Sequence, residues 1–291
     1  MSVENVNPDT AGKRISRLKS RLRAALIVLL LLEVGLHLIF YFTQDALLFH
    51  RVPITPATAR DILTRNPKLR MLEMTAADGT RLQGWSAPAR DIGQAAILFF
   101  GGNGDEISGT VLRVAKATGC AVVGLNYRGY GMSQGAPGEK QIFADALTVY
   151  DELARRKLID PRSVILMGRS LGSGVAVHLA GQRPARALVL ITPYDSVTSV
   201  AQSRYPFLWV RLIIKHPFDS LAHAPQLSWP MLMLVAGQDR TIPPSHALRL
   251  ARHYGGTVTL RIIANAGHDN ILNQQSLWDS MKTFLADNCA G

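Results

Sequence analysis

The sequence has little cysteine and no run of metal-ligating residues. Its 291 residues include two cysteines, Cys120 and Cys289, too few for a disulfide framework and too far apart for a Cys-x-x-Cys site. The histidines His216, His223 and His246 do not fall into the spaced ligand sets typical of zinc sites. We therefore expect no metal and no cysteine chemistry.

Nucleotide-binding loops and nucleic-acid motifs are absent as well. The glycine-rich run GGNGDE (101–106) lacks the Lys-Ser/Thr of a P-loop and the G-x-G-x-x-G order of a dinucleotide site. No basic recognition helix or basic-aromatic motif accompanies the formal charge of +11. We expect no cofactor and no nucleic-acid partner, and we interpret the charge as favouring solubility or attraction to anionic lipid.

Part of that charge lies before a long apolar run. Residues 1–23 hold six of the 32 lysines and arginines but only two acids, and residues 24–42 read AALIVLLLLEVGLHLIFYF. As a helix this run rises about 28 Å, close to the roughly 30 Å hydrocarbon core of a bilayer. Inserting the central Glu33 into the bilayer costs about 2.5–3.5 kcal/mol. The thirteen Leu, Ile, Val and Phe side chains outweigh this cost, because each favours insertion by about 0.3–0.6 kcal/mol. His37, one turn from Glu33, can pair with it or with another helix, or the two form a neutral pair without function.

We expect this run to be an uncleaved anchor. The segment TQDALLFHR that follows it offers no small-x-small cleavage site. The positive charge before the run predicts a single-pass membrane protein with a cytoplasmic N-terminus and an extracytoplasmic domain. The absence of an N-x-S/T sequon favours a bacterial, periplasm-facing protein. The predicted organisation is a basic cytoplasmic segment (1–23), a transmembrane anchor (24–42), a connector (43–68) that is irregular over 51–68, and a large folded domain (69–291).

The remaining chain alternates short apolar runs with amphipathic stretches, which predicts an α/β fold. An Asp-Gly turn at 78–79 indicates an antiparallel hairpin at the entrance to a mostly parallel, doubly wound sheet with flanking helices. The predicted strands are 70–75, 81–86, 96–100, 120–126, 163–167, 187–191, 231–237 and 258–263. The predicted helices are 105–117, 139–156, 171–180, 243–253 and 276–285.

One interval, 193–229, is too long for an ordinary connection and too apolar for a solvated loop. It favours a lid or cap over the strand ends, or equally a crossover helix packed on the sheet. If it is a lid, the aromatic and aliphatic cluster within it is expected to bind substrate, namely Tyr205, Phe207, Leu208 and Trp209.

Directly after the strand at 163–167 comes Gly168-Arg169-Ser170-Leu171-Gly172, followed by a helical run. A G-x-S-x-G between a strand and a helix is typical of a nucleophile elbow, in which small residues allow a strained turn to present the serine. We therefore predict that Ser170 is a nucleophile.

The acid and base should follow in the order Ser, Asp, His, each after a later strand. Asp239 in AGQDRTIPP and His268 in NAGHDN satisfy that order. His268 would take the Ser170 proton and return it to the leaving group, while Asp239 orients the imidazole. Asp195 is the alternative acid, and Asp269 is interpreted as a solvated neighbour.

Two backbone amides are expected to bind the oxyanion. One belongs to Leu171, the residue after the nucleophile, and the other to Asn103 in the glycine-rich loop after the strand at 96–100. A plain flexible glycine turn is the alternative for that loop.

The motifs FFGGNGD, NYRGYGMSQGAP, GRSLGSG, AGQDRTIPPSHA and NAGHDN stand in the order found in the α/β-hydrolase superfamily. From about Met71 onward the sequence resembles, more closely, the BEM46-like branch of membrane-anchored serine hydrolases. The resemblance implies the same triad and oxyanion amides, and a structural loop at 126–133. Relatives usually carry His-Gly where this chain has Gly101-Gly102, which keeps the backbone donor but removes a side chain.

These features predict a membrane-anchored serine hydrolase that cleaves carboxylic esters or thioesters of acyl or lipid-like substrates through an acyl-Ser170 intermediate. Esterase and protein depalmitoylase activities among the relatives agree with this. The alternatives are a serine peptidase or amidase on the same fold, and a catalytically inert, membrane-tethered binding protein. Protein partners are unknown from the sequence.

Overall fold

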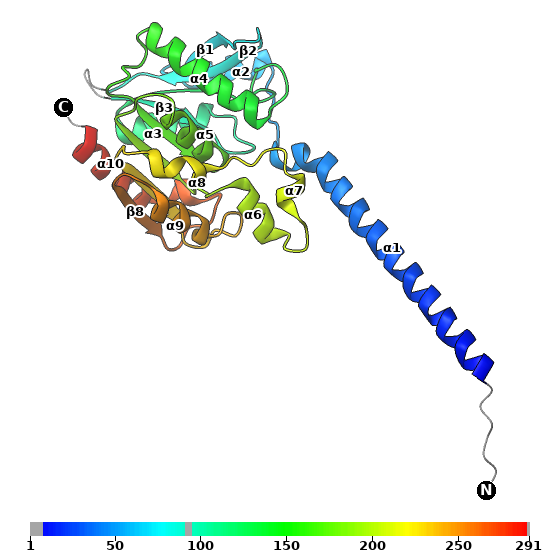
Figure 1. Cartoon of the computed structure of the whole chain (residues 1–291). Helices are drawn as coiled ribbons and strands as arrows, with labels where there is room; N and C mark the ends of the chain where they lie inside the picture. Colours follow the sequence, from blue (N-terminus) through cyan, green and yellow to red (C-terminus); the bar gives the residue numbers. More distant parts are fainter. Residues whose placement is uncertain (1–7, 91–94, 290–291) are drawn as a thin grey trace.

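The computed structural model describes residues 8–90 and 95–289. The first seven residues of the predicted basic segment and the side chain of Cys289 lie outside the described part. A long N-terminal helix, α1 (Pro8–Leu48), projects from an α/β body that contains the rest of the described chain (Figure 1).

The body is built on one sheet of eight strands in the order β1-β2-β4-β3-β5-β6-β7-β8. The first two strands form an antiparallel hairpin, β2 pairs antiparallel with β4, and all later pairings are parallel. This confirms the predicted mostly parallel sheet. The strands are β1 (Arg70–Thr75), β2 (Arg81–Ala87), β3 (Ala96–Phe100), β4 (Ala121–Leu125), β5 (Ile165–Arg169), β6 (Ala187–Ile191), β7 (Met231–Ala236) and β8 (Val258–Ile263).

Helices cover both faces of the sheet, and each face has its own apolar core. Residues of α4 (Glu139–Arg155), α5 (Leu171–Ala180) and α9 (Pro244–His253) fill one core, and those of α3 (Ser108–Thr118) and α10 (Gln275–Cys289) fill the other. Strand β6 is apolar throughout because it contributes side chains to both cores. Leu188 and Leu190 enter the first core while Ala187, Val189 and Ile191 enter the second, because successive side chains point to opposite faces.

Helix α1 extends beyond the predicted anchor. It continues without a break through Leu48, and within it the stretch Ser16–Leu48 is long and apolar enough to cross a membrane once. The helix continues because residues 43–48 contain no glycine or proline to stop it. The irregular connector expected over residues 51–68 is wrong in part, since α2 (Pro56–Arg65) lies inside it. Thr55 caps that helix by accepting a hydrogen bond from the Thr58 amide, and Pro56 provides a preorganised first turn.

The interval 193–229 divides into two parts. Its first part carries α6 (Val197–Arg204) and α7 (Val210–Ile213), which lie beside the end of α1 (Figure 1). Its second part carries α8 (Ser220–His223) and the short 3-10 turn η1 (Ala224–Gln226), which pack against α5 and α9. The interval therefore borders α1 in its first part and the helices α5 and α9 in its second.

Candidate active site

The turn between β5 and α5 holds Ser170 in strained backbone geometry. Its φ of 50° and ψ of −118° lie where residues with a side chain are rarely found. Two glycines make the turn possible. A Cβ at Gly168 would collide with the carbonyl oxygen of Gly172, and a Cβ at Gly172 would collide with that of Phe100. The turn therefore presents Ser170 above the carboxyl end of the sheet, as the G-x-S-x-G spacing predicts.

Loops after β7 and β8 bring Asp239 and His268 to this serine. His268 Nε2 lies 2.9 Å from Ser170 Oγ, and His268 Nδ1 lies 2.7 Å from Asp239 Oδ2. The other carboxylate oxygen of Asp239 accepts hydrogen bonds from the backbone amides of Thr241 and Ile242, at 2.9 and 2.8 Å. The carboxylate is thus fixed from both sides, and a single chain of hydrogen bonds joins it through the imidazole to the serine.

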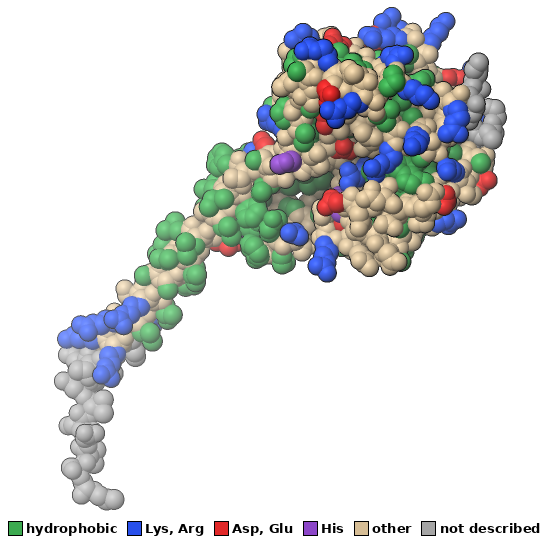
Figure 2. Space-filling model, turned by 180° about the vertical axis from the view of Figure 1, so that it is seen from behind, with side chains coloured by type: hydrophobic (Ala, Val, Ile, Leu, Met, Phe, Trp, Pro, Cys, Tyr) green, Lys and Arg blue, Asp and Glu red, His purple; other side chains and the backbone are tan. Residues whose placement is uncertain are grey.

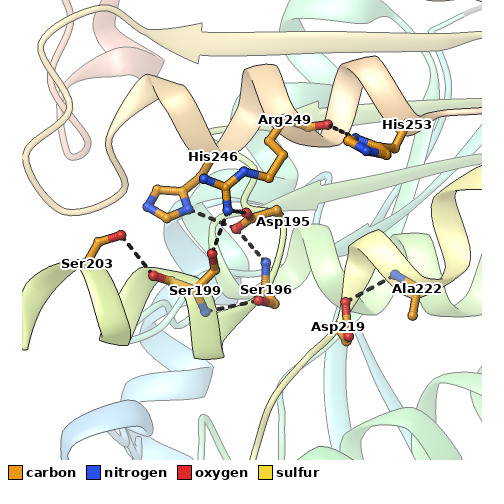
Figure 3. Close-up of polar contacts among 9 residues, drawn as sticks. All are labelled: Asp195, Ser196, Ser199, Ser203, Asp219, Ala222, His246, Arg249 and His253. Atoms are coloured by element: carbon orange, nitrogen blue, oxygen red, sulfur yellow. Dashed lines mark hydrogen bonds and ion pairs between the residues drawn. The ribbon is translucent and has the colours of Figure 1, made fainter. Parts of the chain in front are cut away.

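The alternative acid Asp195 has other partners (Figure 3). Its Oδ1 lies 2.8 Å from His246 Nδ1 and accepts the Ser196 amide at 2.7 Å, while its Oδ2 accepts from Arg249 at 2.8 Å. Burial would raise the pKa of Asp195, but the hydrogen bonds from His246 and Ser196 outweigh it and hold the pKa below its ordinary value. This cluster ties the chain just before α6 to α9. The Asp195 carboxylate is therefore bonded to His246, Ser196 and Arg249, whereas the His268 ring is bonded to Asp239 and Ser170.

The loop after β3 lies against the other side of the serine. A Cβ on Gly102 would come within 3.4 Å of Ser170 Cβ. The Asn103 side chain holds the loop, because its Oδ1 accepts hydrogen bonds from the His50 amide at 2.6 Å and from the Tyr130 hydroxyl at 3.0 Å. The structure thus brings Asn103 and Leu171, the two predicted amide donors, to the same cavity as Ser170.

Close packing around Gly101 leaves little room for a side chain at that position. A Cβ at Gly101 would lie 2.6 Å from Cγ2 of Ile107, a side chain that is 1% exposed. The Tyr127 hydroxyl also donates a hydrogen bond of 2.9 Å to the Gly101 carbonyl. A histidine at position 101 would therefore require Ile107 to move.

A cavity of about 430 Å³ opens beside Ser170 and His268. Of the four residues expected to bind substrate, Tyr205 and Leu208 line this cavity. Phe207 and Trp209 do not, and their side chains are 57% and 68% exposed on the surface. Asp269 is exposed at the edge of the cavity.

Helix α1 supplies a wall of the same cavity, which sequence reasoning missed. Phe40, Gln44, Leu47 and Leu48 of α1 line it together with α6 and α7. Their spacing of i, i+4, i+7 and i+8 places them on one helical face, which is the one signal in the sequence that could have indicated a contact.

Polar bonds hold α1 against the segment after α6. Gln44 donates to the Ile213 carbonyl at 2.9 Å and accepts the Lys215 amide at 2.7 Å. His216 Nε2 lies 3.1 Å from Asp45 Oδ1, and its Nδ1 accepts the Glu139 amide at 3.2 Å. The end of α1 is therefore bonded to the 205–216 segment and, through His216, to α4.

His178 and Arg169 flank the serine turn in the sequence. His178, on the helix after the serine, stacks on Phe143 with ring centroids 3.8 Å apart, and burial lowers its pKa to about 4. Arg169 Nη1 lies 3.7 Å from Asp105 Oδ2 behind the serine. Within residues 8–90 and 95–289, no three His, Cys, Asp or Glu side chains come close enough together to hold a metal ion.

Comparisons with known proteins show which family the chain resembles. A family model described as "Serine aminopeptidase, S33" matches residues 93–217. An uncharacterised protein of Mycobacterium tuberculosis is 32% identical over 226 residues, covering 76% of this chain and 80% of its own. The α/β-hydrolase domain-containing protein WAV2 of Arabidopsis thaliana is 28% identical over 226 residues, covering 70% of this chain and 73% of its own.

Solved structures show the same fold. An esterase of Pyrococcus furiosus superimposes with a TM-score of 0.64 at 15% identity, covering 83% of this chain and 99% of the esterase. An α/β hydrolase of Vibrio vulnificus superimposes with a TM-score of 0.63 at 21% identity, covering 80% of this chain and 87% of its own. With the fold, the serine turn and these relatives together, the chain belongs to the α/β-hydrolase superfamily.

Proposed function

We propose that this hydrolase-family chain is a serine hydrolase of the BEM46-like branch that cleaves carboxylic esters or thioesters. The observation that carries the proposal is the unbroken hydrogen-bond chain from Asp239 through His268 to Ser170, at 2.7 and 2.9 Å. The strained serine turn supports it, because strain of this kind persists where it positions a reacting group.

In the first half of the reaction, Ser170 Oγ attacks the acyl carbon while His268 Nε2 takes its proton. Asp239 holds the proton on Nδ1 and stabilises the imidazolium. The backbone amides of Asn103 and Leu171 would donate to the negative oxygen of the tetrahedral intermediate. Collapse of that intermediate breaks the bond to the alcohol or thiol, which leaves with the proton from His268.

In the second half, water attacks the acyl-Ser170 ester. His268 again takes a proton, now from the water, and returns it to Ser170 as the carboxylic acid departs. No cofactor is needed for either half.

The cavity supports the proposed substrate class. Its lining is mainly aliphatic and aromatic, including Tyr205, Leu208, Val210 and the α1 residues Phe40 and Leu47. Such a lining favours an acyl chain over a sugar or a polar peptide. The anchor, with a basic N-terminal segment on the cytoplasmic side, would hold the site just outside the bilayer, in the periplasm if the source is bacterial.

The deciding experiment is labelling of the purified full chain with a fluorophosphonate, which reacts with activated serines. We expect labelling of the wild type and loss of labelling in Ser170→Ala and His268→Ala. Ser203→Ala and His253→Ala on the exposed faces of α6 and α9 are the matched controls and should label like the wild type. A folded wild type that does not label would favour the inert, membrane-tethered binding protein.

A peptidase or amidase is the second candidate, because the matching family model is described as a serine aminopeptidase. The same triad can attack an amide, so the labelling experiment does not separate the two. Hydrolysis of an aminoacyl amide should be measured beside the ester of the same acyl group. We expect the protein to favour the ester over the amide by a larger factor than the uncatalysed reactions do. A smaller factor, or faster hydrolysis of the amide, would favour the peptidase.

A further inference from the structure

The segment Tyr205–Ile213 contacts the anchor at a level that lies within its apolar run. The Trp209 amide donates a hydrogen bond of 3.1 Å to His37 Nε2. The rings of Tyr205 and Phe40 meet edge to face, with centroids 4.9 Å apart. Both anchor residues lie inside the apolar run 24–42.

The level of this contact can be placed in a bilayer from charge alone. Arg23 bounds the apolar run on one side, and after Glu33 the next charged residue is Asp45. A hydrocarbon core of about 30 Å that begins after Arg23 ends about 20 residues later, close to Thr43. His37 then lies about 9 Å inside that boundary at about 1.5 Å per residue. A segment bonded to His37 is therefore held at the depth of the outer acyl chains.

His37 itself is suited to this contact. Its Nδ1 lies 2.8 Å from the Glu33 carbonyl, so it carries the proton, and Nε2 is left free to accept from Trp209. A polar residue in an apolar span is costly unless it finds a partner. Here the partner comes from the body of the protein. The docked segment thus satisfies His37 within the span.

The outward surface of the segment carries three large apolar side chains, beside the exposed Arg211. Phe207, Trp209 and Leu212 are 57%, 68% and 74% exposed. We refer to these three side chains as the apolar rim. Figure 2 shows hydrophobic side chains along the anchor that continue onto the adjoining edge of the body. A patch of this kind beside water would be unfavourable, whereas aromatic and aliphatic side chains at the edge of a bilayer are stabilised by it.

The cavity reaches the same level. Phe40 and Tyr205, which touch each other at the anchor, line the cavity that contains Ser170 and His268. The apolar lining therefore extends from the candidate nucleophile to a residue inside the apolar run. An acyl chain at the depth of Phe40 would meet hydrophobic side chains along this path.

We propose that the apolar rim is inserted in the outer leaflet and that the acyl chain of a bilayer-resident substrate enters the cavity sideways from the membrane, between α1 and the Tyr205–Ile213 segment. The bilayer partner is a lipid surface. The entry route rests on the proposed hydrolase function, whereas the insertion of the rim does not.

The insertion is tested by tryptophan quenching in the full chain, reconstituted into vesicles with bromine on the lipid acyl chains. Trp209 is the exposed tryptophan among the four, since Trp85 and Trp278 are 0% and 8% exposed and Trp229 is partly buried. We expect brominated lipid to quench the wild type and to quench Trp209→Phe clearly less. Equal quenching of the two proteins would overturn the insertion, whatever the enzyme activity.

The entry route is tested with two esters, a long-chain acyl ester held in vesicles and a short water-soluble ester. Charging the rim in Phe207→Asp/Leu212→Asp should lower hydrolysis of the vesicle-held ester by about tenfold, because aspartate is unfavourable at this depth. Hydrolysis of the short ester should stay within about twofold, since neither side chain lines the cavity. Equal loss on both esters, or no loss on either, would overturn the route.

A matched control charges an exposed leucine at the far end of the body. Leu158 is 46% exposed and follows the last residue of α4. The first residue of α4, Glu139, contacts His216 near the anchor, so Leu158 lies at the opposite end of that helix. Leu158→Asp should hydrolyse both esters like the wild type. If Leu158→Asp reduced vesicle hydrolysis as the rim variant does, the effect would not be specific to the rim and the route would be rejected.

Discussion

Replacing Asp195 should reduce stability and leave the reactivity of Ser170 intact. Asp195 is 1% exposed and accepts hydrogen bonds from buried His246, from the Ser196 amide and from Arg249. Removing one partner of a buried ionic pair costs about 3–5 kcal/mol, and a half-exposed arginine adds little to that. We therefore expect Asp195→Ala to lower the free energy of unfolding by about 3 kcal/mol. For a domain of this size, the loss corresponds to about 6–12 °C in Tm.

The assay combines thermal unfolding of the full chain in detergent with the rate of fluorophosphonate labelling at a temperature where each variant is folded. Asp195→Ala should label at nearly the wild-type rate, because the His268 ring is bonded to Asp239 and Ser170 and not to Asp195. Asp239→Asn should show the opposite pattern. Its amide cannot hold the productive tautomer of His268, so labelling should slow by about 10³–10⁴ while the unfolding temperature changes less.

Two results would refute this reasoning. A Tm of Asp195→Ala within about 2 °C of the wild type would show that the buried cluster does not stabilise the fold to the extent expected from its burial. Loss of labelling in Asp195→Ala together with normal labelling in Asp239→Asn would show that Asp195 is the acid of the reaction. Asp195→Asn keeps the shape of the side chain and two hydrogen-bonding atoms. Its Tm should therefore lie between those of Asp195→Ala and the wild type.

Three further outcomes can be measured by unfolding and labelling. Gly172→Ala should destabilise by about 2 kcal/mol and slow labelling, because its Cβ would collide with the Phe100 carbonyl, whereas Gly109→Ala, which meets nothing within 4 Å, should not. Burial raises the pKa of Glu139 from 4.5 to about 6, so between these pH values the folded state binds the proton more tightly than the unfolded state does. The free energy of unfolding should therefore fall by about 1–2 kcal/mol as pH rises from about 4.5 to 6. Glu139→Gln should flatten that decline, and an unchanged decline would assign it to another group. Arg128→Met leaves buried Asp145 without its two hydrogen bonds of 2.8 and 2.7 Å. The free energy of unfolding, measured in urea, should fall by about 3 kcal/mol. A fall of less than about 0.5 kcal/mol would contradict a stabilising role for this pair.

The central strands of the sheet could be predicted because they are buried on both faces. Continuous apolar runs between turn residues gave the same limits for β3 and β6 as the structure has. The strand before the serine was less well placed. It was expected at 163–167 but runs over Ile165–Arg169, because Ser163 and Val164 belong to a turn whose amides bond to the Asp160 carbonyl.

Residues whose role depends on a distant contact could not be predicted in the same way. The apolar character of Phe207 and Trp209 is plain in the sequence, but the direction of their side chains depends on how the 205–213 segment meets α1. The contact joins positions about 170 residues apart, and no local pattern encodes which segment α1 meets. Helix α2 is a different case, since its Thr55-Pro56 start is a local signal that the sequence analysis did not use.

The continuity of α1 with the body sets how the enzyme would meet its substrate. No flexible tether separates the anchor from the site, because the helix runs to Leu48 and Asp45 and Gln44 are bonded to the body. A chain anchored as proposed would hold Ser170 at one height above the membrane plane. Its turnover should then depend on the number of substrate molecules per unit area of membrane and on diffusion within that plane. Diluting vesicles in buffer would leave the rate per enzyme unchanged, whereas diluting the substrate with inert lipid would lower it.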